Sequence, residues 1–257
     1  MKKNSKIFLI ILNIRRQAPV IFFVLLIGSW MSIRPWSFFT PETPVHLQNI
    51  SPRIPPFFTL LINPAGDAKD TGREIDGTFE RGITMQCASE LKKALEERIS
   101  GLRVILTRFP GEVIEPLQNA SFANRLTIDL YLSLHFFQHS EKLHRLFLYH
   151  VLYNPEIDVW EKKSNELVLL PYDQAYTLSI KRTIDYGTEL FKSAKSIERA
   201  YNIVCHKLQG LPFKPLAGIS APSVAFECGI RKKDDWKPLV PFLVTLLEPI
   251  ITRRREL

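Results

Sequence analysis

Hydrophobic positions along the chain follow two patterns, short continuous apolar runs and longer stretches with helical spacing. A run such as FFTLLIN at 57–63 is typical of a strand that is buried on both faces. The stretch at 79–100 instead repeats an apolar residue every four positions, which predicts a helix with one apolar face. These positions are Phe79, Ile83, Cys87, Leu91 and Leu95.

The same two patterns recur in alternation along the rest of the chain. Further strands are predicted at 102–107, 128–137, 144–153 and 222–229, and further helices at 115–126, in two stretches within 176–208, and at 234–254. Alternation of this kind indicates an α/β fold, a three-layer sandwich with a mainly parallel central sheet. In such sheets ligands bind at the carboxyl ends of the strands.

The N-terminal region has a different pattern, because residues 17–33 carry no charged side chain. Their length is close to what a bilayer-spanning helix needs, and most of the nearby positive charge precedes them. We therefore predict a basic cytoplasmic N-terminus at 1–16 and a transmembrane signal anchor at 17–34. A cleaved signal peptide is the alternative, and the absence of an A-x-A-like cleavage site argues against it.

Six prolines between residues 35 and 56 predict a stiff, extended linker, and the folded domain is expected at 57–257. Together with the anchor, this order predicts a single-pass protein of the cytoplasmic (inner) membrane. The domain would lie on the extracytoplasmic, periplasmic side.

Charge and cysteine content narrow the function classes further. The formal net charge is +8, but residues 1–34 contain six basic residues and no acidic one, so the rest of the chain is nearly neutral. A nearly neutral domain gives no support to nucleic acid as a partner. The three cysteines, Cys87, Cys205 and Cys228, form no C-x-x-C pair, which argues against a zinc knuckle and a disulfide framework.

Three polar residues fall at corresponding ends of predicted elements. Glu80 begins a helix, His135 closes the third strand, and Glu227 closes the last strand. Glu80 and His135 each have a purely structural alternative, a carboxylate favoured by the helix dipole and a hydrogen-bonded core histidine. Glu227 is harder to explain in this way, because a carboxylate that follows a buried apolar run is rarely left without a partner. Together they predict a shared site at one edge of the sheet.

The order of several motifs resembles the zinc-dependent N-acetylmuramoyl-L-alanine amidases, which act on the peptidoglycan of bacterial cell envelopes. The resemblance covers roughly residues 57–252 and rests on INPAGDAKDTG, VILTR, FAN, DLYLSLH and PSVAFECGI. In the family, the first histidine of D-P-G-H-G-G-x-D-P-G, a glutamate at a helix start and the histidine of S-x-H hold zinc. These positions correspond here to Gly66, Glu80 and His135, and the family's catalytic carboxylate corresponds to Glu227.

The first zinc ligand is thus replaced by Gly66, and Asp67 is the candidate substitute, since zinc accepts carboxylate ligands. The other departures from the motifs are an asparagine for the leading aspartate, two alanines for glycines, and an asparagine for an arginine. They are Asn63, Ala65, Ala68 and Asn119.

The resemblance implies hydrolysis of the amide bond between the lactyl group of N-acetylmuramic acid and L-alanine. Zinc would activate a water molecule, and Glu227 would move its proton to the leaving nitrogen. Two alternatives stay open: an inactive pseudoamidase that binds peptidoglycan or regulates an amidase, and a structural envelope protein. Peptidoglycan is the expected partner, with the membrane and an envelope protein as further candidates.

Overall fold

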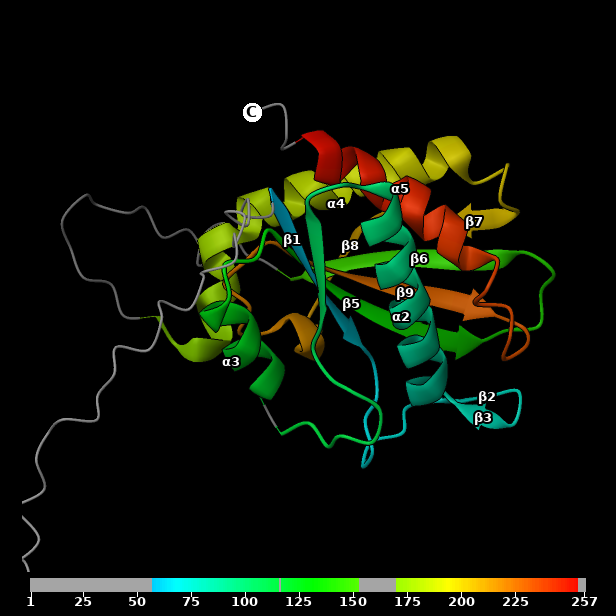
Figure 1. Cartoon of the computed structure of the whole chain (residues 1–257), viewed down its shortest axis with the longest axis horizontal. Coiled ribbons are helices and arrows are strands. Elements are labelled where there is room, and N and C mark those ends of the chain that lie inside the picture. Colours follow the sequence, from blue (N-terminus) through cyan, green and yellow to red (C-terminus); the bar gives the residue numbers. More distant parts are fainter. Residues whose placement is uncertain (1–56, 116, 153–169, 254–257) are drawn as a thin grey trace, which may run out of the picture. The chain divides into compact units, whose positions relative to one another are not determined.

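A seven-stranded sheet runs through the computed structural model, which describes residues 57–115, 117–152 and 170–253 (Figure 1). The spatial order of the strands is β4-β1-β5-β9-β6-β7, and β8 also pairs with β6. Strand β6 runs antiparallel to β9, and the other pairs in this sheet are parallel. The strands are β1 (Phe58–Pro64), β4 (Leu102–Leu106), β5 (Leu130–Gln138), β6 (His144–Val151), β7 (Ile203–Cys205), β8 (Gln209–Leu211) and β9 (Ser223–Ile230).

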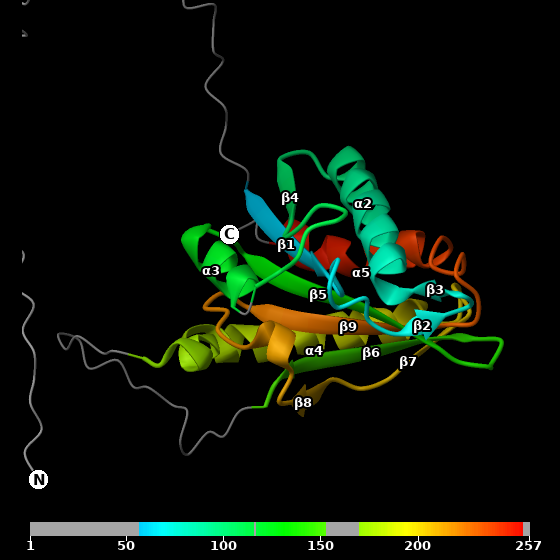
Figure 2. The ribbon, with the colours of Figure 1, turned by 90° about the horizontal axis from the view of Figure 1, so that it is seen from below.

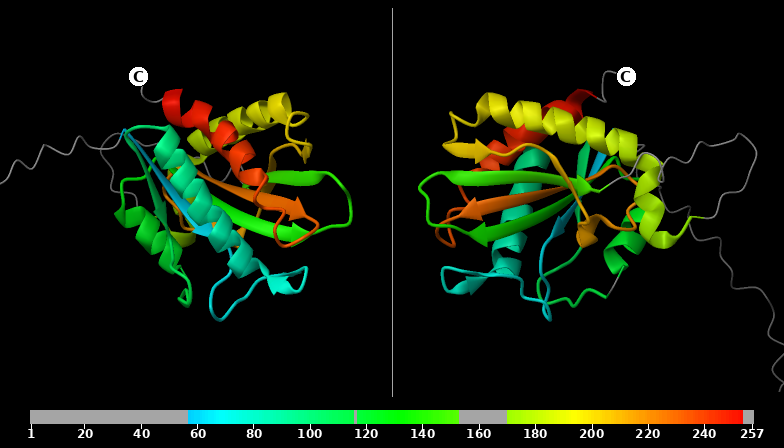
Figure 3. Two further views of the ribbon diagram at one scale, coloured as in Figure 1. Left: turned by 45° about the vertical axis from the view of Figure 1, so that its right-hand side comes forward. Right: turned by 180° about the vertical axis from the view of Figure 1, so that it is seen from behind.

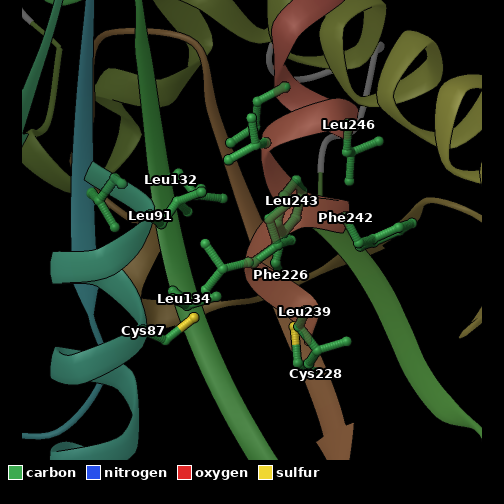
Figure 4. Close-up of a cluster of buried hydrophobic side chains, with 14 of the residues drawn as sticks. Cys87, Leu91, Leu132, Leu134, Phe226, Cys228, Leu239, Phe242, Leu243 and Leu246 are labelled. Atoms are coloured by element: carbon green, nitrogen blue, oxygen red, sulfur yellow. The ribbon is translucent and has the colours of Figure 1, made fainter. Parts of the chain in front are cut away.

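Three helices cover one face of the sheet, namely α2 (Glu80–Arg98), α4 (Ile180–Ile197) and α5 (Leu239–Arg253) (Figure 2). Cys87 and Leu91 of α2 pack in this core with Leu134, Phe226 and Leu243, and all five are fully buried (Figure 4). Burying a large apolar side chain contributes roughly 1.5–3 kcal/mol, so this cluster stabilises the position of α2 on the sheet. The right-hand view of Figure 3 shows α4, in yellow-green, running alongside the strands.

The opposite face is covered by α3 (Gln118–Arg125) and by a short 3-10 turn, η2 (Lys214–Leu216). Tyr131 of β5 and Ala225 of β9 contribute to this second, smaller core. Because helical elements cover both faces, the strands are apolar on both sides, which explains their continuous hydrophobic runs. The predicted α/β fold with a mainly parallel central sheet is confirmed.

A small hairpin joins the first strand to α2 and was not predicted. It consists of β2 (Glu74–Ile75) and β3 (Thr78–Phe79), with Asp76 and Gly77 in its turn at φ of 50° and 72°. Such left-handed turn positions favour glycine and aspartate. The hairpin ends where α2 begins and so helps to fix the first turn of that helix.

The end of the segment at 176–208 differs from the predicted helical structure. The segment 176–208 was predicted as two helical stretches, but the structure has η1 (Tyr172–Ser179) and α4, followed by strand β7. Residues 203–205 are strand because they pair with β6, a long-range contact that helical spacing does not report. The predicted N-terminus, anchor and linker, which together make up residues 1–56, lie outside the described residues. Within the described ranges, no helix has the length and apolar character to cross a membrane.

Candidate functional site

We call one region of the molecule the rim. It consists of the carboxyl ends of β1, β5 and β9 and the loops that follow them. Residues His135 and Glu227 are direct neighbours in the parallel register of β5 and β9. Glu80 reaches the same place from the start of α2, where its Oε1 atom lies 3.5 Å from His135 Nδ1. The structure thus brings the three positions together, while their roles as ligands and base stay predictions. His135 and Glu227 do not close their strands as predicted, because β5 continues to Gln138 and β9 to Ile230.

Glu80 is held by main-chain donors as well as by the histidine. Its Oε1 atom accepts a hydrogen bond from Phe136 N at 2.9 Å, and its Oε2 atom accepts one from Arg73 N at 3.1 Å. Burial by itself raises the pKa of Glu80, but these donors and His135 outweigh it, so that the pKa is lowered from the ordinary value. Gly72 permits this contact, since a Cβ atom there would lie 2.7 Å from Glu80 Oε2.

His135 makes hydrogen bonds through a second buried residue. Its Nε2 atom lies 2.8 Å from Ser133 Oγ, which itself accepts a hydrogen bond from Asn63 Nδ2 at 3.1 Å. Which atom donates in the Ser133–His135 contact depends on the imidazole tautomer; a proton on Nδ1, toward the Glu80 carboxylate, leaves Nε2 to accept from the serine hydroxyl. Ser133 is fully buried, so this Ser-His-Glu arrangement orients the imidazole and offers no accessible nucleophile.

Both carboxylate oxygens of Glu227 are occupied. Arg73 Nη1 lies 2.6 Å from Oε1, and the Tyr149 hydroxyl donates to Oε2 at 3.0 Å. The same Arg73 Nη1 atom also donates to the carbonyl oxygen of Phe136 at 3.3 Å. Burial, followed by the charge of Glu227, raises the pKa of Tyr149. Sequence reasoning missed Arg73 and Tyr149, and no motif marks either of them.

The loop that follows β1 is organised by Asp67. Its Oδ1 atom accepts hydrogen bonds from the amides of Lys69 at 2.7 Å and Asp70 at 2.6 Å, and its Oδ2 atom accepts one from the Ile114 amide at 3.0 Å. Burial raises the pKa of Asp67, but these amides and the Arg108 charge outweigh it, and the pKa is lowered. The carboxylate therefore ties two loops together, and a role for Asp67 as a substitute zinc ligand stays a prediction.

Arg108, the last residue of the VILTR motif, holds the start of the same loop through hydrogen bonds to its main chain. It is buried and donates to the carbonyl oxygens of Pro64, Ala65 and Arg81 at 3.0–3.1 Å. Buried charges need such partners, so the motif has a structural role at the rim.

Two of the departures from the family motifs are in direct contact. Asn119 Nδ2 donates to Asn63 Oδ1 at 2.8 Å, and Thr107 Oγ1 donates to the same oxygen at 2.9 Å. The resemblance places an aspartate and an arginine at these two positions, so a pair of opposite charges has been replaced by a neutral amide pair. Asn63 is 5% exposed, which makes replacement of one charge without the other costly.

A cavity of about 330 Å³ opens beside this network at the carboxyl ends of β1 and β5. Its lining includes the loop residues Gly66 and Asp67, His135 from β5, Asn119 from α3 and Lys214 from η2. Glycine at position 66 has a φ of 75°, and a Cβ atom there would lie 2.8 Å from Arg81 Cβ. The backbone at this position therefore disfavours any larger residue.

Comparison with known proteins agrees with this architecture. The N-acetylmuramoyl-L-alanine amidase family model matches residues 60–240, which is more than half of the chain. The chain belongs to this family. It is thus an N-acetylmuramoyl-L-alanine amidase-like protein, from a family whose substrate is peptidoglycan.

Individual relatives of the amidase family are distant. The N-acetylmuramoyl-L-alanine amidase CwlM of Bacillus licheniformis is 29% identical over 76 residues, and this match spans 30% of each chain. The catalytic domain of CwlV from Bacillus (Paenibacillus) polymyxa superposes with a TM-score of 0.52 at 13% identity, covering 76% of this chain and 98% of that one. The CwlD amidase of Clostridioides difficile, solved in complex with the GerS lipoprotein, gives the same four values. These structures share the fold.

The donors at the rim do not fit the zinc site that the family resemblance implies. Gly66 offers no side-chain donor, so Glu80 and His135 are the two family ligands that the chain retains. Across 57–115, 117–152 and 170–253, no group of three histidine, cysteine, aspartate or glutamate side chains is placed to hold a metal ion. A catalytic zinc needs three protein ligands, so the amidase-like domain lacks the donor set for one in this arrangement.

Proposed function

We propose that this chain acts on peptidoglycan by binding the junction between N-acetylmuramic acid and the stem peptide, which is the bond that amidases of its family cleave. Family membership supports the choice of substrate. The cavity at the rim is the observation that carries the proposal, because its lining includes Gly66 and His135, which correspond to two of the family's ligand positions, and Glu227 is the register neighbour of His135.

The cavity has the chemistry that a muramoyl-peptide junction requires. Its lining includes Gly66 and Asn119, whose peptide and side-chain amide groups would pair with the amides of the ligand. Lys214 lies on the edge formed by η2 and is exposed, where it would attract the carboxylates of a stem peptide. The arrangement therefore supports recognition of the junction without a metal ion.

Hydrolysis of the same amide bond is the second candidate function. It is favoured by Glu227, which keeps the position of the family's catalytic carboxylate next to His135. In the present arrangement Arg73 and Tyr149 occupy both oxygens of Glu227. A general base must lie within hydrogen-bond reach of the proton it removes, so for hydrolysis that proton would have to reach a remaining lone pair of Glu227 or displace Arg73.

The cellular setting is proposed from residues 1–56 and from one of the structural relatives. An uncleaved anchor at 17–34 would hold the domain on the outer side of the cytoplasmic membrane, where peptidoglycan lies. The CwlD amidase was solved with a lipoprotein, and an envelope protein is accordingly a candidate partner for this chain.

Co-sedimentation of the purified full-length chain with peptidoglycan sacculi tests the proposal. Binding should be competed by muramyl dipeptide, which contains the junction, and not by N-acetylmuramic acid alone. Mass spectrometry of the supernatant shows at the same time whether stem peptides are released. Absence of sacculus binding would refute the proposed function, and release of stem peptides would establish the second candidate.

A charge reversal at the cavity edge supplies the matched variants. Lys214→Glu should weaken sacculus binding by roughly tenfold, corresponding to about 1.4 kcal/mol. Lys232→Glu makes the same charge change at an exposed position that does not line the cavity, and it should bind as the unmodified chain does. Equal binding by both variants would place the ligand elsewhere on the surface.

A further inference from the structure

The ligands that remain from the amidase family's metal site all have partners within the chain. Glu80 accepts two main-chain hydrogen bonds and lies beside His135. His135 Nε2 is hydrogen-bonded to Ser133 Oγ, and Glu227, which corresponds to the family's catalytic carboxylate, has a donor on each oxygen. Buried or half-buried polar groups are costly when unpaired, so a metal site that has lost its metal must find other partners.

Arg73 supplies the positive charge among these partners. Its guanidinium contacts Glu227 Oε1 at 2.6 Å and the carbonyl oxygen of Phe136 at 3.3 Å. Its own peptide N–H donates to Glu80 Oε2 at 3.1 Å. One residue thus contacts both carboxylates of the rim, through its main chain on one side and its side chain on the other.

The loop geometry sets the position of Arg73. Gly72 adopts a φ of 69° directly before it, and the Glu80 amide donates to the carbonyl oxygen of Arg73 at 2.8 Å. The main chain of Arg73 therefore donates a hydrogen bond to the Glu80 side chain and accepts one from the Glu80 amide. Tyr149, from the neighbouring strand β6, holds the other oxygen of Glu227 and keeps that carboxylate in place for the guanidinium.

We propose that the Arg73 side chain takes the electrostatic place of the family's zinc ion, so that the rim of this chain is neutralised without metal. A Zn²⁺ ion near Glu227 would be repelled by the guanidinium and would have to displace it from the carboxylate. The inference rests on the proposed function in one respect, since both assume that the rim corresponds to the zinc site of the amidase family. A rim that is neutralised by Arg73 needs no third zinc ligand, which explains why glycine is tolerated at position 66.

Zinc binding by the full-length chain tests the inference directly. Equilibrium dialysis against Zn²⁺, followed by metal analysis, should give well under one zinc per unmodified chain. Arg73→Gln removes the charge and frees Glu227 beside Glu80 and His135, and we expect its zinc affinity to rise at least roughly tenfold. Arg73→Lys keeps the charge and should bind zinc as poorly as the unmodified chain.

Arg98→Gln is the matched control, because Arg98 is also about half exposed and pairs with a glutamate, Glu248, away from the rim. It should leave zinc affinity unchanged. Stoichiometric zinc in the unmodified chain, or the same weak zinc affinity in Arg73→Gln, would overturn the inference. Equal zinc affinities in Arg73→Gln and Arg73→Lys would also overturn it, because the charge would then have no role.

A second measurement needs no variant and covers the case in which Arg73→Gln does not fold. Excess EDTA and equimolar Zn²⁺ should both leave the thermal unfolding temperature of the unmodified chain unchanged, because a ligand that does not bind the folded state does not stabilise it. A fall with EDTA or a rise with zinc would refute the inference. Sacculus binding is scored separately, so loss of the proposed function leaves the zinc result interpretable.

Discussion

The core under α2 and α5 and the rim at the strand ends are two neighbouring regions held by different interactions. In the core, Leu91, Leu134 and Phe226 are fully buried and interact through apolar contact alone. At the rim, Asn63, Glu80 and Glu227 interact through directional hydrogen bonds and an ion pair. The core tolerates a change of residue that preserves volume, whereas the rim requires each donor to meet its own acceptor.

This difference shows how an amidase-like fold can be kept while residues at the rim differ from the family motifs. Glu80 belongs to the rim, but the apolar packing of α2 on the sheet is made by Cys87, Leu91 and other residues further along the helix, so glycine at position 66 leaves this core intact. The rim, in contrast, has changed at several positions that contact one another, as Asn63 and Asn119 do. A polar network that is only partly satisfied is less stable than one that is complete, and this favours such paired changes.

The largest effect is expected in the core. Phe226→Ala should lower the free energy of unfolding by about 3–5 kcal/mol, because it removes a fully buried ring between β5 and α5 and leaves a cavity. Urea unfolding followed by circular dichroism measures the change. Leu178→Ala, at a residue that is 65% exposed, should change it by less than about 0.5 kcal/mol. Similar losses in the two variants would contradict the division between core and surface.

The next effect concerns the asparagine pair. Asn63→Asp places a charge at a site that is 5% exposed and should cost about 3 kcal/mol of stability. Combining it with Asn119→Arg restores the pair that the family resemblance implies, and the double variant should recover most of this loss. A double-mutant cycle measures the coupling. Additive effects would show that the two positions are independent despite their 2.8 Å contact.

A smaller loss is expected from Asp67→Ala, about 2 kcal/mol at neutral pH, since three main-chain amides lose their acceptor. The folded-state pKa of Asp67 lies below the ordinary value of 3.8, so its stabilisation is present above that pH and fades as the pH falls through the folded-state pKa. The stability difference from the unmodified chain should therefore shrink below about pH 4. A constant difference across this range would contradict a role for the ionised carboxylate.

The smallest effect belongs to Gly66→His, which restores the family's residue. We expect a loss of about 1 kcal/mol, because the backbone has a φ of 75° and the new Cβ atom would approach Arg81. Zinc uptake should rise more in Gly66→His combined with Arg73→Gln than in Gly66→His alone. Full zinc occupancy in the single variant would show that Arg73 is no obstacle to the metal.

Much of the fold could be predicted because the signals are local. The apolar run at 57–63 and the four-residue spacing along 79–100 reflect burial on two faces or on one, and the structure confirms β1 and α2 there. The two helices expected within 176–208 show the limit of such signals. Strand β7 exists because it pairs with β6, and pairing between distant segments leaves little trace in a short window of sequence.

The candidate site divides in the same way. Sequence alone indicated that Glu80, His135 and Glu227 lie near the carboxyl ends of parallel strands. In a parallel sheet these strand ends and the starts of the following helices lie on the same side, and this does not depend on how the core packs. Only the tertiary structure decided what those side chains bind. Arg73 meets Glu227, which lies far away in the chain, and Asp67 turns to its own loop amides, because distance and direction in space choose the partner of a polar group.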